Sequence, residues 1–240
     1  MPHSQISFKD ACARLGVPEQ ILRDAVKYNE VPFRKQGAEV TFTASELAAW
    51  GSARVLSLNS KTLLSEHTHS TRMNVKNIRD DILLPKLVKA EFIELDLTAK
   101  TRKSVIRDLV DKADALGLLC DPADMLAQLE EREAVSSTAL PGGIALPHPH
   151  HPAPYLVMEP FILVARARKP IWFGAEDDSP TDIFCLVCCD ENMRHLHVLA
   201  RLCMMIRDTD ILTSLRSATT PDEAVEALYA AECAVLARLR

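Results

Sequence analysis

The sequence of 240 residues contains no apolar run that approaches the roughly 20 residues needed to span a bilayer. Its first residues, MPHSQISFKDACARLG, lack the basic start and apolar stretch of a signal peptide. We therefore expect no membrane insertion and a cytoplasmic location. Hydrophobic residues make up 48% and charged residues 25%, which is ordinary for a globular protein.

Paired cysteines are also lacking. The seven cysteines are odd in number and lie mostly in apolar runs, which indicates buried thiols in a reducing compartment. The stretch "CLVCC" holds a C-x-x-C motif at Cys185 and Cys188, but no second such motif accompanies it. Because it lies inside a hydrophobic run, we expect core packing rather than redox or zinc chemistry.

A strong excess of positive charge is absent as well. Residues 1–80 hold 11 Lys/Arg against 8 Asp/Glu, a net charge of +3, whereas residues 81–240 hold 17 against 25, a net charge of −8. The imbalance suggests two parts with different partners, although +3 is far from a strong nucleic-acid footprint.

The first 57 residues carry the pattern of a small helical module with a hairpin. Apolar residues recur at helical spacing in residues 7–15 and again from Pro18, with Gly16 between the two runs. The stretch "VPFRKQGAEVTFT" alternates around Gly37 as a hairpin would, and "TASELAAW" begins another helix. This order of elements predicts a winged helix-turn-helix domain.

The same residues resemble the small excisionase-like, MerR-related DNA-binding modules in "DACARLGV" (10–17), "NEVPFRKQG" (29–37) and "FTASELAAW" (42–50). In such modules the second helix and the wing face DNA, which implies phosphate contacts from Arg23, Lys27, Arg34 and Lys35. Residues 1–57 carry a net charge of only +1. The alternative is a protein-binding module on which these four charges are solvated.

Residues 58–80 contain no glycine or proline but many Ser, Thr, Asn and charged residues. We expect a linker there, partly helical, with His67 and His69 exposed rather than acting as ligands. This divides the chain into a module at 1–57, a linker at 58–80 and a second domain at 81–240.

The second domain alternates helical and strand patterns. Helical spacing occurs in residues 99–117, 121–135, 192–208 and 220–240, with β-rich runs at 154–171 and 182–189 between them. Interleaved helices and strands predict an α/β fold.

One segment of this domain, residues 130–148, places a histidine where it can act chemically. A helix is expected to end near Val135, Gly142 and Gly143 permit a tight turn, and a short apolar strand runs into Pro147 and His148. A histidine directly after a strand is held stiffly at the rim of a sheet. That placement suits a nucleophile, because a neutral imidazole nitrogen has to reach an incoming reactant.

This segment resembles the enzyme IIA domain of the mannitol/fructose/nitrogen-regulatory class of the bacterial phosphotransferase system. The class pattern "RE…ST-x-x-x-x-G-[IV]-A-[ILF]-P-H" is met by residues 132–148. Further matches are "FGAEDDSPTD" (173–182), the His195 stretch "HLHVLARL" (195–202), and the ending from Asp208 to Glu223. The resemblance spans roughly residues 82–235 and implies a mixed sheet flanked by helices.

The resemblance implies that His148 accepts a phosphoryl group from the phosphohistidine of the carrier protein HPr or a paralogue. His195 then corresponds to the histidine that hydrogen-bonds the phosphoryl oxygens, and Arg132 to an arginine that helps to neutralise them. Further candidate phosphate-binding residues are Ser137, Thr138 and His150. Implied partners are a IIB protein or a regulated target protein, with DNA as a further candidate, and no cofactor or metal is implied.

The segment departs from the class after the acceptor histidine, where Pro149, His150 and His151 replace a small residue and a Lys or Arg. Proline removes an N–H group that could have held phosphate. Three histidines in four positions also resemble a metal-binding tract. The open alternatives are therefore a His-cluster metal protein and a non-catalytic protein-binding sensor with an enzyme IIA fold. Because no IIB-like or membrane IIC segment is present, a phosphorylation-responsive regulator is favoured over sugar transport.

Overall fold

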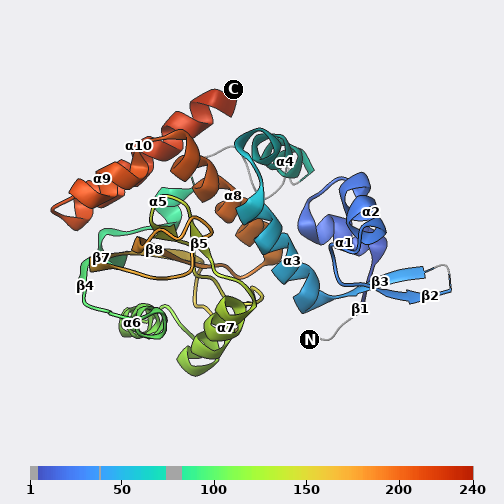
Figure 1. Cartoon of the computed structure of the whole chain (residues 1–240), viewed down its shortest axis with the longest axis horizontal. Coiled ribbons are helices and arrows are strands. Elements are labelled where there is room, and N and C mark those ends of the chain that lie inside the picture. Colours follow the sequence, from blue (N-terminus) through green and yellow to red (C-terminus); the bar gives the residue numbers. More distant parts are fainter. Residues whose placement is uncertain (1–4, 38, 74–82, 240) are drawn as a thin grey trace.

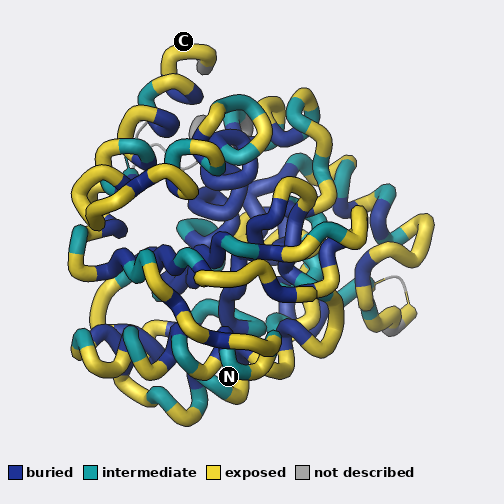
Figure 2. The backbone as a smooth tube through the Cα atoms, turned by 60° about the vertical axis from the view of Figure 1, so that its left-hand side comes forward, coloured by how far each residue is buried: buried dark blue, intermediate teal, exposed yellow. Residues whose placement is uncertain are grey.

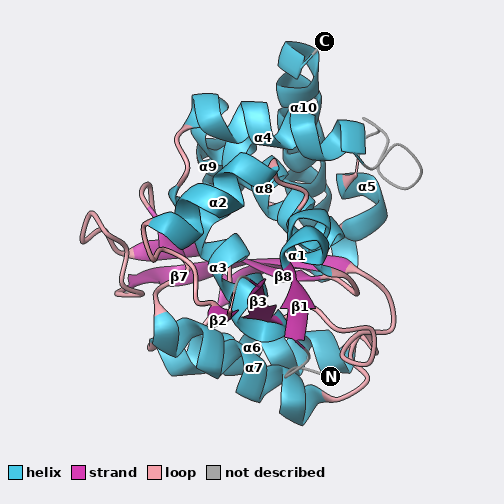
Figure 3. Cartoon of the chain, turned by 90° about the vertical axis from the view of Figure 1, so that its right-hand side faces the viewer, coloured by secondary structure: helices cyan, strands magenta, loops and turns pink. Residues whose placement is uncertain are grey.

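The computed structural model describes residues 5–37, 39–73 and 83–239. Its first elements form a three-stranded sheet with three helices, and the remainder forms a five-stranded sheet that is covered by helices on both faces (Figures 1 and 3). None of the helices described is both long and apolar enough to cross a membrane.

The N-terminal module, residues 5–57, has its helices and hairpin where the sequence predicts them. Its elements in chain order are β1 (Gln5–Ser7), α1 (Phe8–Leu15), α2 (Glu19–Lys27), β2 (Arg34–Gln36), β3 (Glu39–Thr43) and α3 (Ala44–Ser57). Strand β3 pairs antiparallel with both β1 and β2. The Ser7 side chain caps α1 by accepting a hydrogen bond from the Asp10 amide, and Gly16 ends the helix with a positive φ of 64°. The strand β1 is an addition that the sequence pattern did not reveal.

Helix α4 (Ser60–Met73) occupies most of the segment expected to be a linker. It packs against α8, and Leu63 and His67, one helical turn apart, face inward with 1% and 2% of their surface exposed. The prediction that His67 is an exposed linker residue is therefore wrong, because the helix turns it into the interior. The side chain of His69 lies outside the described part of the structure.

The second domain is a mixed sheet flanked by helices, as the sequence predicts. Its elements are α5 (Leu84–Leu87), a 3-10 turn (Ala90–Phe92), β4 (Ile93–Leu97), α6 (Arg102–Ala115), α7 (Pro122–Val135), β5 (Ala139–Leu140), β6 (Ile144–Ala145), β7 (Phe161–Ile171), β8 (Thr181–Cys188), α8 (Asn192–Asp208), α9 (Ile211–Ser217) and α10 (Pro221–Leu239). The strand order is β4-β7-β8-β6-β5. The pairs β4–β7 and β6–β8 are parallel, and β7–β8 and β5–β6 are antiparallel.

Both faces of the central strands are buried (Figure 2). Along β8, Ile183, Cys185 and Val187 pack under α8, α9 and α10, while the alternating residues pack toward α6 and α7. Cys185 and Cys188 therefore lie on opposite faces of one strand, which confirms core packing for this motif. Burial raises the pKa of Cys185 to about 12.

Every residue of α8 from 195 to 205 is buried, which shows that neighbouring elements enclose this part of the helix on several sides. The helices α3, α4 and α10 all contact it, and its charged residue Arg201 is 1% exposed. Arg201 donates to Glu232 of α10 at 2.8 Å, and Glu232 also accepts hydrogen bonds from the backbone amides of Leu83 and Leu84. This carboxylate therefore joins α8, α10 and the start of α5.

We expect Glu232→Ala to lower the free energy of unfolding by about 3–5 kcal/mol, because it leaves a buried guanidinium and two amides without their acceptor. Urea denaturation followed by circular dichroism measures this. The matched control is Glu226→Ala, an exposed carboxylate on the same helix, for which a change within about 0.5 kcal/mol is expected. Equal stabilities for the two variants would contradict the role assigned to Glu232.

Candidate functional site

His148 follows the short strand β6, and both of its ring nitrogens are engaged. The Nδ1 atom lies 2.7 Å from the Leu146 carbonyl oxygen, and the preceding Pro147 carbonyl accepts a hydrogen bond from Val187 of β8 at 2.9 Å. A carbonyl can only accept, so this contact places the ring proton on Nδ1. The lone pair is then on Nε2, which is the nitrogen that can act as a nucleophile.

Arg132 lies in the last turn of α7 and directs its guanidinium at that nitrogen. Its Nε donates to Nε2 of His148 at 3.1 Å, and its Nη1 donates to the Ser136 carbonyl at 2.8 Å. The Nη2 atom is buried and has no hydrogen-bond partner among the described residues. One donor atom of a 2% exposed arginine is thus left over beside His148.

His195 lies in the first turn of α8, and its ring centroid is 5.0 Å from that of His148. Its Nε2 is 3.3 Å from the Ser52 hydroxyl of α3, whereas its buried Nδ1 has no hydrogen-bond partner in the region described. The beginning of a helix carries a partial positive charge, which favours an anion at this position. The structure therefore brings together the three residues that the sequence selected as catalytic: His148, His195 and Arg132.

Burial controls the charge state of the two rings. Burial, together with the nearby His195 and Arg132, holds the pKa of His148 well below its ordinary value. Burial and then Arg132 lower the pKa of His195 to about 3. Both rings are neutral at neutral pH, so the only full charge at the centre of the site is the Arg132 cation.

Ser137 and Thr138, which the sequence proposed as phosphate ligands, use their hydroxyl groups elsewhere. The Ser137 hydroxyl donates to the Phe173 carbonyl at 2.8 Å, and the Thr138 hydroxyl donates to Glu133 at 2.7 Å. Glu133 also pairs with Arg102 at 2.6 Å. These residues shape the turn between α7 and β5, and neither hydroxyl has a proton to spare for a phosphoryl oxygen in this arrangement.

His150 and His151 lie on the loop that follows His148 and are half-buried. The amide of His150 donates to the Gln128 carbonyl at 3.3 Å, which fixes the start of the loop against α7. The two rings meet edge to face with centroids 6.3 Å apart. Within residues 5–37, 39–73 and 83–239, no group of three or more His, Cys, Asp or Glu side chains is arranged to hold a metal ion.

Two contacts of the site were missed from the sequence. Ser136 holds the Arg132 guanidinium, and its position next to the proposed Ser137 offered a weak signal. Ser52 offered none, because it lies 143 residues from His195 in the chain.

The four basic residues proposed for DNA contact are all exposed on α2 and β2 of the N-terminal module: Arg23, Lys27, Arg34 and Lys35.

Comparison with known proteins agrees with this fold. Residues 86–231 match the family described as "Phosphoenolpyruvate-dependent sugar phosphotransferase system, EIIA 2". The match covers more than half of the chain, so the chain belongs to this EIIA family. It does not extend to the N-terminal module.

Two named proteins are similar to part of the chain. The chain is 33% identical to a nitrogen regulatory protein of Bradyrhizobium diazoefficiens over 55% of its own length and 84% of that protein. It is 30% identical to the 2-O-alpha-mannosyl-D-glycerate-specific EIIABC component of Escherichia coli over 60% of its length, but spans only 22% of that larger protein.

Solved structures show the same fold. The nitrogen regulatory protein IIA-Ntr of Neisseria meningitidis superposes with a TM-score of 0.54 at 25% identity, over 60% of this chain and 97% of that one. The IIA mannitol domain of Escherichia coli gives a TM-score of 0.52 at 24% identity, over 59% of this chain and 98% of that one.

The lowered pKa of His195 predicts a specific dependence of stability on pH. Below about pH 6.5 the unfolded chain binds a proton on this residue that the folded chain does not, so stability is lost as the pH falls toward 3. In His195→Gln, which keeps a polar group opposite Ser52 but cannot titrate, we expect the loss between pH 7.5 and 5.5 to be about 1.4 kcal/mol smaller.

Urea unfolding at constant ionic strength at the two pH values measures this difference. The control is Met204→Leu, a volume-conserving change in the same helix that adds and removes no titrating group. Met204→Leu should show the same pH dependence of stability as the wild type. If His195→Gln showed this pH dependence too, the lowered pKa assigned to His195 would be refuted.

Proposed function

We propose that this chain is a phosphoryl carrier that accepts a phosphoryl group on Nε2 of His148 from the phosphohistidine of an HPr-like protein. The observation that carries the proposal is the pair of contacts on the His148 ring. The Leu146 carbonyl fixes the proton on Nδ1, and the Arg132 guanidinium orients the lone pair of Nε2 through a hydrogen bond that it donates to this atom. A neutral, oriented imidazole is the nucleophile that transfer requires.

In the transfer step, the hydrogen bond from Arg132 to Nε2 breaks, and the Nε2 lone pair forms a bond to phosphorus as the bond from phosphorus to the donor nitrogen breaks. The electron pair of the broken bond stays on the donor nitrogen. Nδ1 of His148 keeps its proton and continues to donate a hydrogen bond to the Leu146 carbonyl. Such transfer passes through a loose, in-line transition state, so that positioning and charge stabilisation supply most of the catalysis.

The residues beside His148 have the donors that this charge needs. The phosphoryl group brings a charge of about −2 and three acceptor oxygens. Arg132 has its buried Nη2 available, and Nδ1 of His195 is likewise without a partner among the residues described. Donors fixed in advance in a buried site stabilise developing charge more than the same donors would in water.

Phosphorylation by enzyme I, HPr and phosphoenolpyruvate tests the proposal. Intact-mass spectrometry should show the gain of one phosphoryl group in the wild type and none in His148→Ala. We expect Arg132→Met to slow the reaction by about 10²-fold or more, because it removes a charged donor from the transferring group.

The matched control is Arg102→Met, which removes the neighbouring arginine that pairs with Glu133 and has no contact with His148 in the structure. It should slow the reaction far less than Arg132→Met does. A wild-type chain that gains no phosphoryl group from carriers of its own organism would overturn the phosphoryl-carrier proposal and favour a non-catalytic, protein-binding role.

We further propose that the N-terminal module, as a winged helix-turn-helix domain, couples this reaction to DNA binding. The supporting observation is that α2 and β3 line one open hollow through Arg23, Lys27, Glu39 and Val40. Helix α2 and the strand β2, which pairs with β3, expose the four basic side chains. Exposed Lys and Arg side chains on adjacent elements suit contact with a phosphate backbone. Arg23 also forms an ion pair with Glu19 at 3.0 Å, which uses part of its hydrogen-bonding capacity.

Binding to a pool of random-sequence DNA duplexes at several salt concentrations tests this coupling. We expect Arg34→Ala/Lys35→Ala to weaken binding and to reduce the slope of log K against log salt by about 1 for each phosphate contact that the substitutions remove. Lys103→Ala, an exposed charge on α6 of the second domain, should leave both unchanged. Absence of binding at low salt would leave protein docking as the role of the module.

A further inference from the structure

The site that we propose for phosphoryl transfer is closed in this structure. His148, Arg132 and His195 expose 1%, 2% and 0% of their surfaces. The donor of the phosphoryl group is a histidine of another protein, and its nitrogen has to approach Nε2 in line. Some part of the chain must therefore move before transfer can occur.

The N-terminal module covers the first turn of α8, which carries His195. The Ser52 hydroxyl of α3 lies 3.3 Å from Nε2 of His195, and the Asn192 side chain donates to the Arg14 carbonyl of α1 at 3.1 Å. Leu196, the residue after His195, packs into the hydrophobic cluster of the N-terminal module rather than into that of the sheet. The covering contacts are thus made by α1 and α3.

The opposite rim of the site is the loop that follows His148. A hollow of about 240 Å³ separates residues 151–155 of this loop from Ala44, Leu47 and Ala48 on α3. Helix α3 therefore contacts His195 and also faces the loop that follows His148. The N-terminal module would therefore compete for this face with any protein that presents a phosphohistidine to His148.

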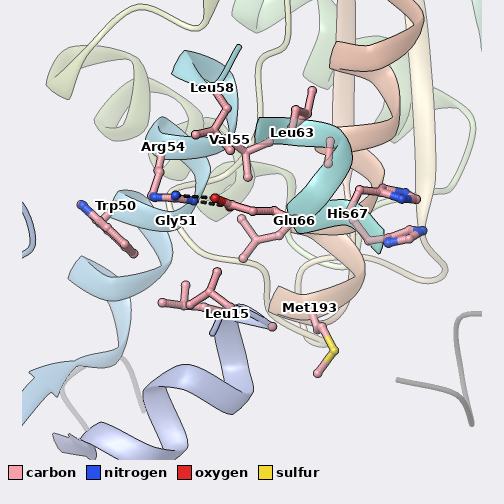
Figure 4. A pocket seen from close by; sticks show the side chains of 15 residues that line it. Leu15, Trp50, Gly51, Arg54, Val55, Leu58, Leu63, Glu66, His67 and Met193 are labelled. Atoms are coloured by element: carbon pink, nitrogen blue, oxygen red, sulfur yellow. Dashed lines mark hydrogen bonds and ion pairs between the residues drawn. The ribbon is translucent and has the colours of Figure 1, made fainter. Parts of the chain in front are cut away.

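The interface that holds the module in place is incompletely packed. A cavity of about 40 Å³ lies between α1, α3, α4 and α8, and Figure 4 shows Leu15, Trp50 and Gly51 of the N-terminal module around it, together with His67 and Met193. At Gly51 the helices come so close that a Cβ atom would lie 2.7 Å from Leu15 Cδ2 and 3.3 Å from Leu196 Cδ1.

Helix α3 is anchored differently at its two ends. Its first half packs in the N-terminal cluster through Leu47, whereas Leu56 belongs to the core of the second domain. Arg54 pairs with Glu66 of α4, and Arg207 of α8 donates to the Leu56 carbonyl at 2.7 Å, so the second half stays with α8. Gly51 and Ser52 lie between the two halves, and a Gly/Ser pair is a common site of helix bending.

We propose that residues 5–52 form a lid on the His148 site, which bends away at Gly51 and Ser52 for phosphoryl transfer and stays displaced while His148 is phosphorylated. The proposal rests on the proposed phosphoryl-carrier function. A phosphoryl group needs space beside His148 that the closed, buried site does not provide. If His195 turns to a phosphoryl oxygen, it leaves Ser52, and the closed position loses its polar contact with the site.

Two full-length variants test the lid through the rate of HPr-dependent phosphorylation, measured by intact mass. Ser52→Ala removes the contact to His195 and should raise the rate about twofold to tenfold, the effect of losing one hydrogen bond from the closed state. Leu196→Ala weakens the apolar contact and should raise the rate as well. The matched control is Ser57→Ala, an exposed serine of the same helix that bonds only to Arg54, and its rate should equal that of the wild type.

Hydrogen–deuterium exchange of the wild-type chain supplies a second readout. The amides of residues 44–52 should exchange faster after phosphorylation, while those of α6, on the far face of the sheet, should not change. Rates in Ser52→Ala and Leu196→Ala that are equal to or below the wild-type rate, with unchanged exchange in α3, would overturn the lid and leave the carrier function intact. Failure of all the variants and of the wild type to take up phosphate would overturn both.

Discussion

The rest of the structure depends on the burial of residues 195–205 of α8. Its residues 195–205 touch the sheet on one side and α3, α4 and α10 on the others. Burial of a polar group is costly unless the group is hydrogen-bonded within the protein. Arg201 pairs with Glu232 of α10, and the Nε2 atom of His195 lies against the Ser52 hydroxyl of α3. The contacts that attach the N-terminal module and α10 to the sheet are therefore partly set by the polar side chains of this one helix.

Burial also determines the chemistry of the site. A charged imidazole is disfavoured in a low-dielectric interior, so His148 and His195 remain neutral beside the Arg132 cation. Neutrality supplies a lone pair on His148, and the single positive charge matches an arriving anion. The same burial that keeps the proposed nucleophile, His148, neutral also hides it from solvent, so its neutrality and the closure of the site have one physical cause.

Much of this could be predicted from local sequence pattern. The helix over 192–208, the strand at 182–188 and the three site residues all follow from periodicity or from motif matches in the chain. What could not be predicted depends on contacts between distant segments. Residues 58–80 read as a linker because their composition is polar, and only the packing of α4 on α8 turns His67 inward. The pairing of Ser52 with His195 has no local signal, because no spacing rule joins residues 143 positions apart.

A contact between two domains at a reactive group constrains both of them. When the closed lid disfavours phosphorylation, thermodynamic linkage requires that phosphorylation disfavours the closed lid by the same free energy. Any partner that binds the N-terminal module only when it is displaced then promotes phosphate uptake on His148, whether that partner is DNA or protein. The size of the effect is limited by the differential contacts, which here are one hydroxyl–imidazole contact, one amide–carbonyl hydrogen bond and the apolar surface around Leu196. So few contacts correspond to a coupling free energy of about 1–3 kcal/mol between lid closure and phosphorylation of His148. That value is enough for a graded regulator and too small for an all-or-none switch.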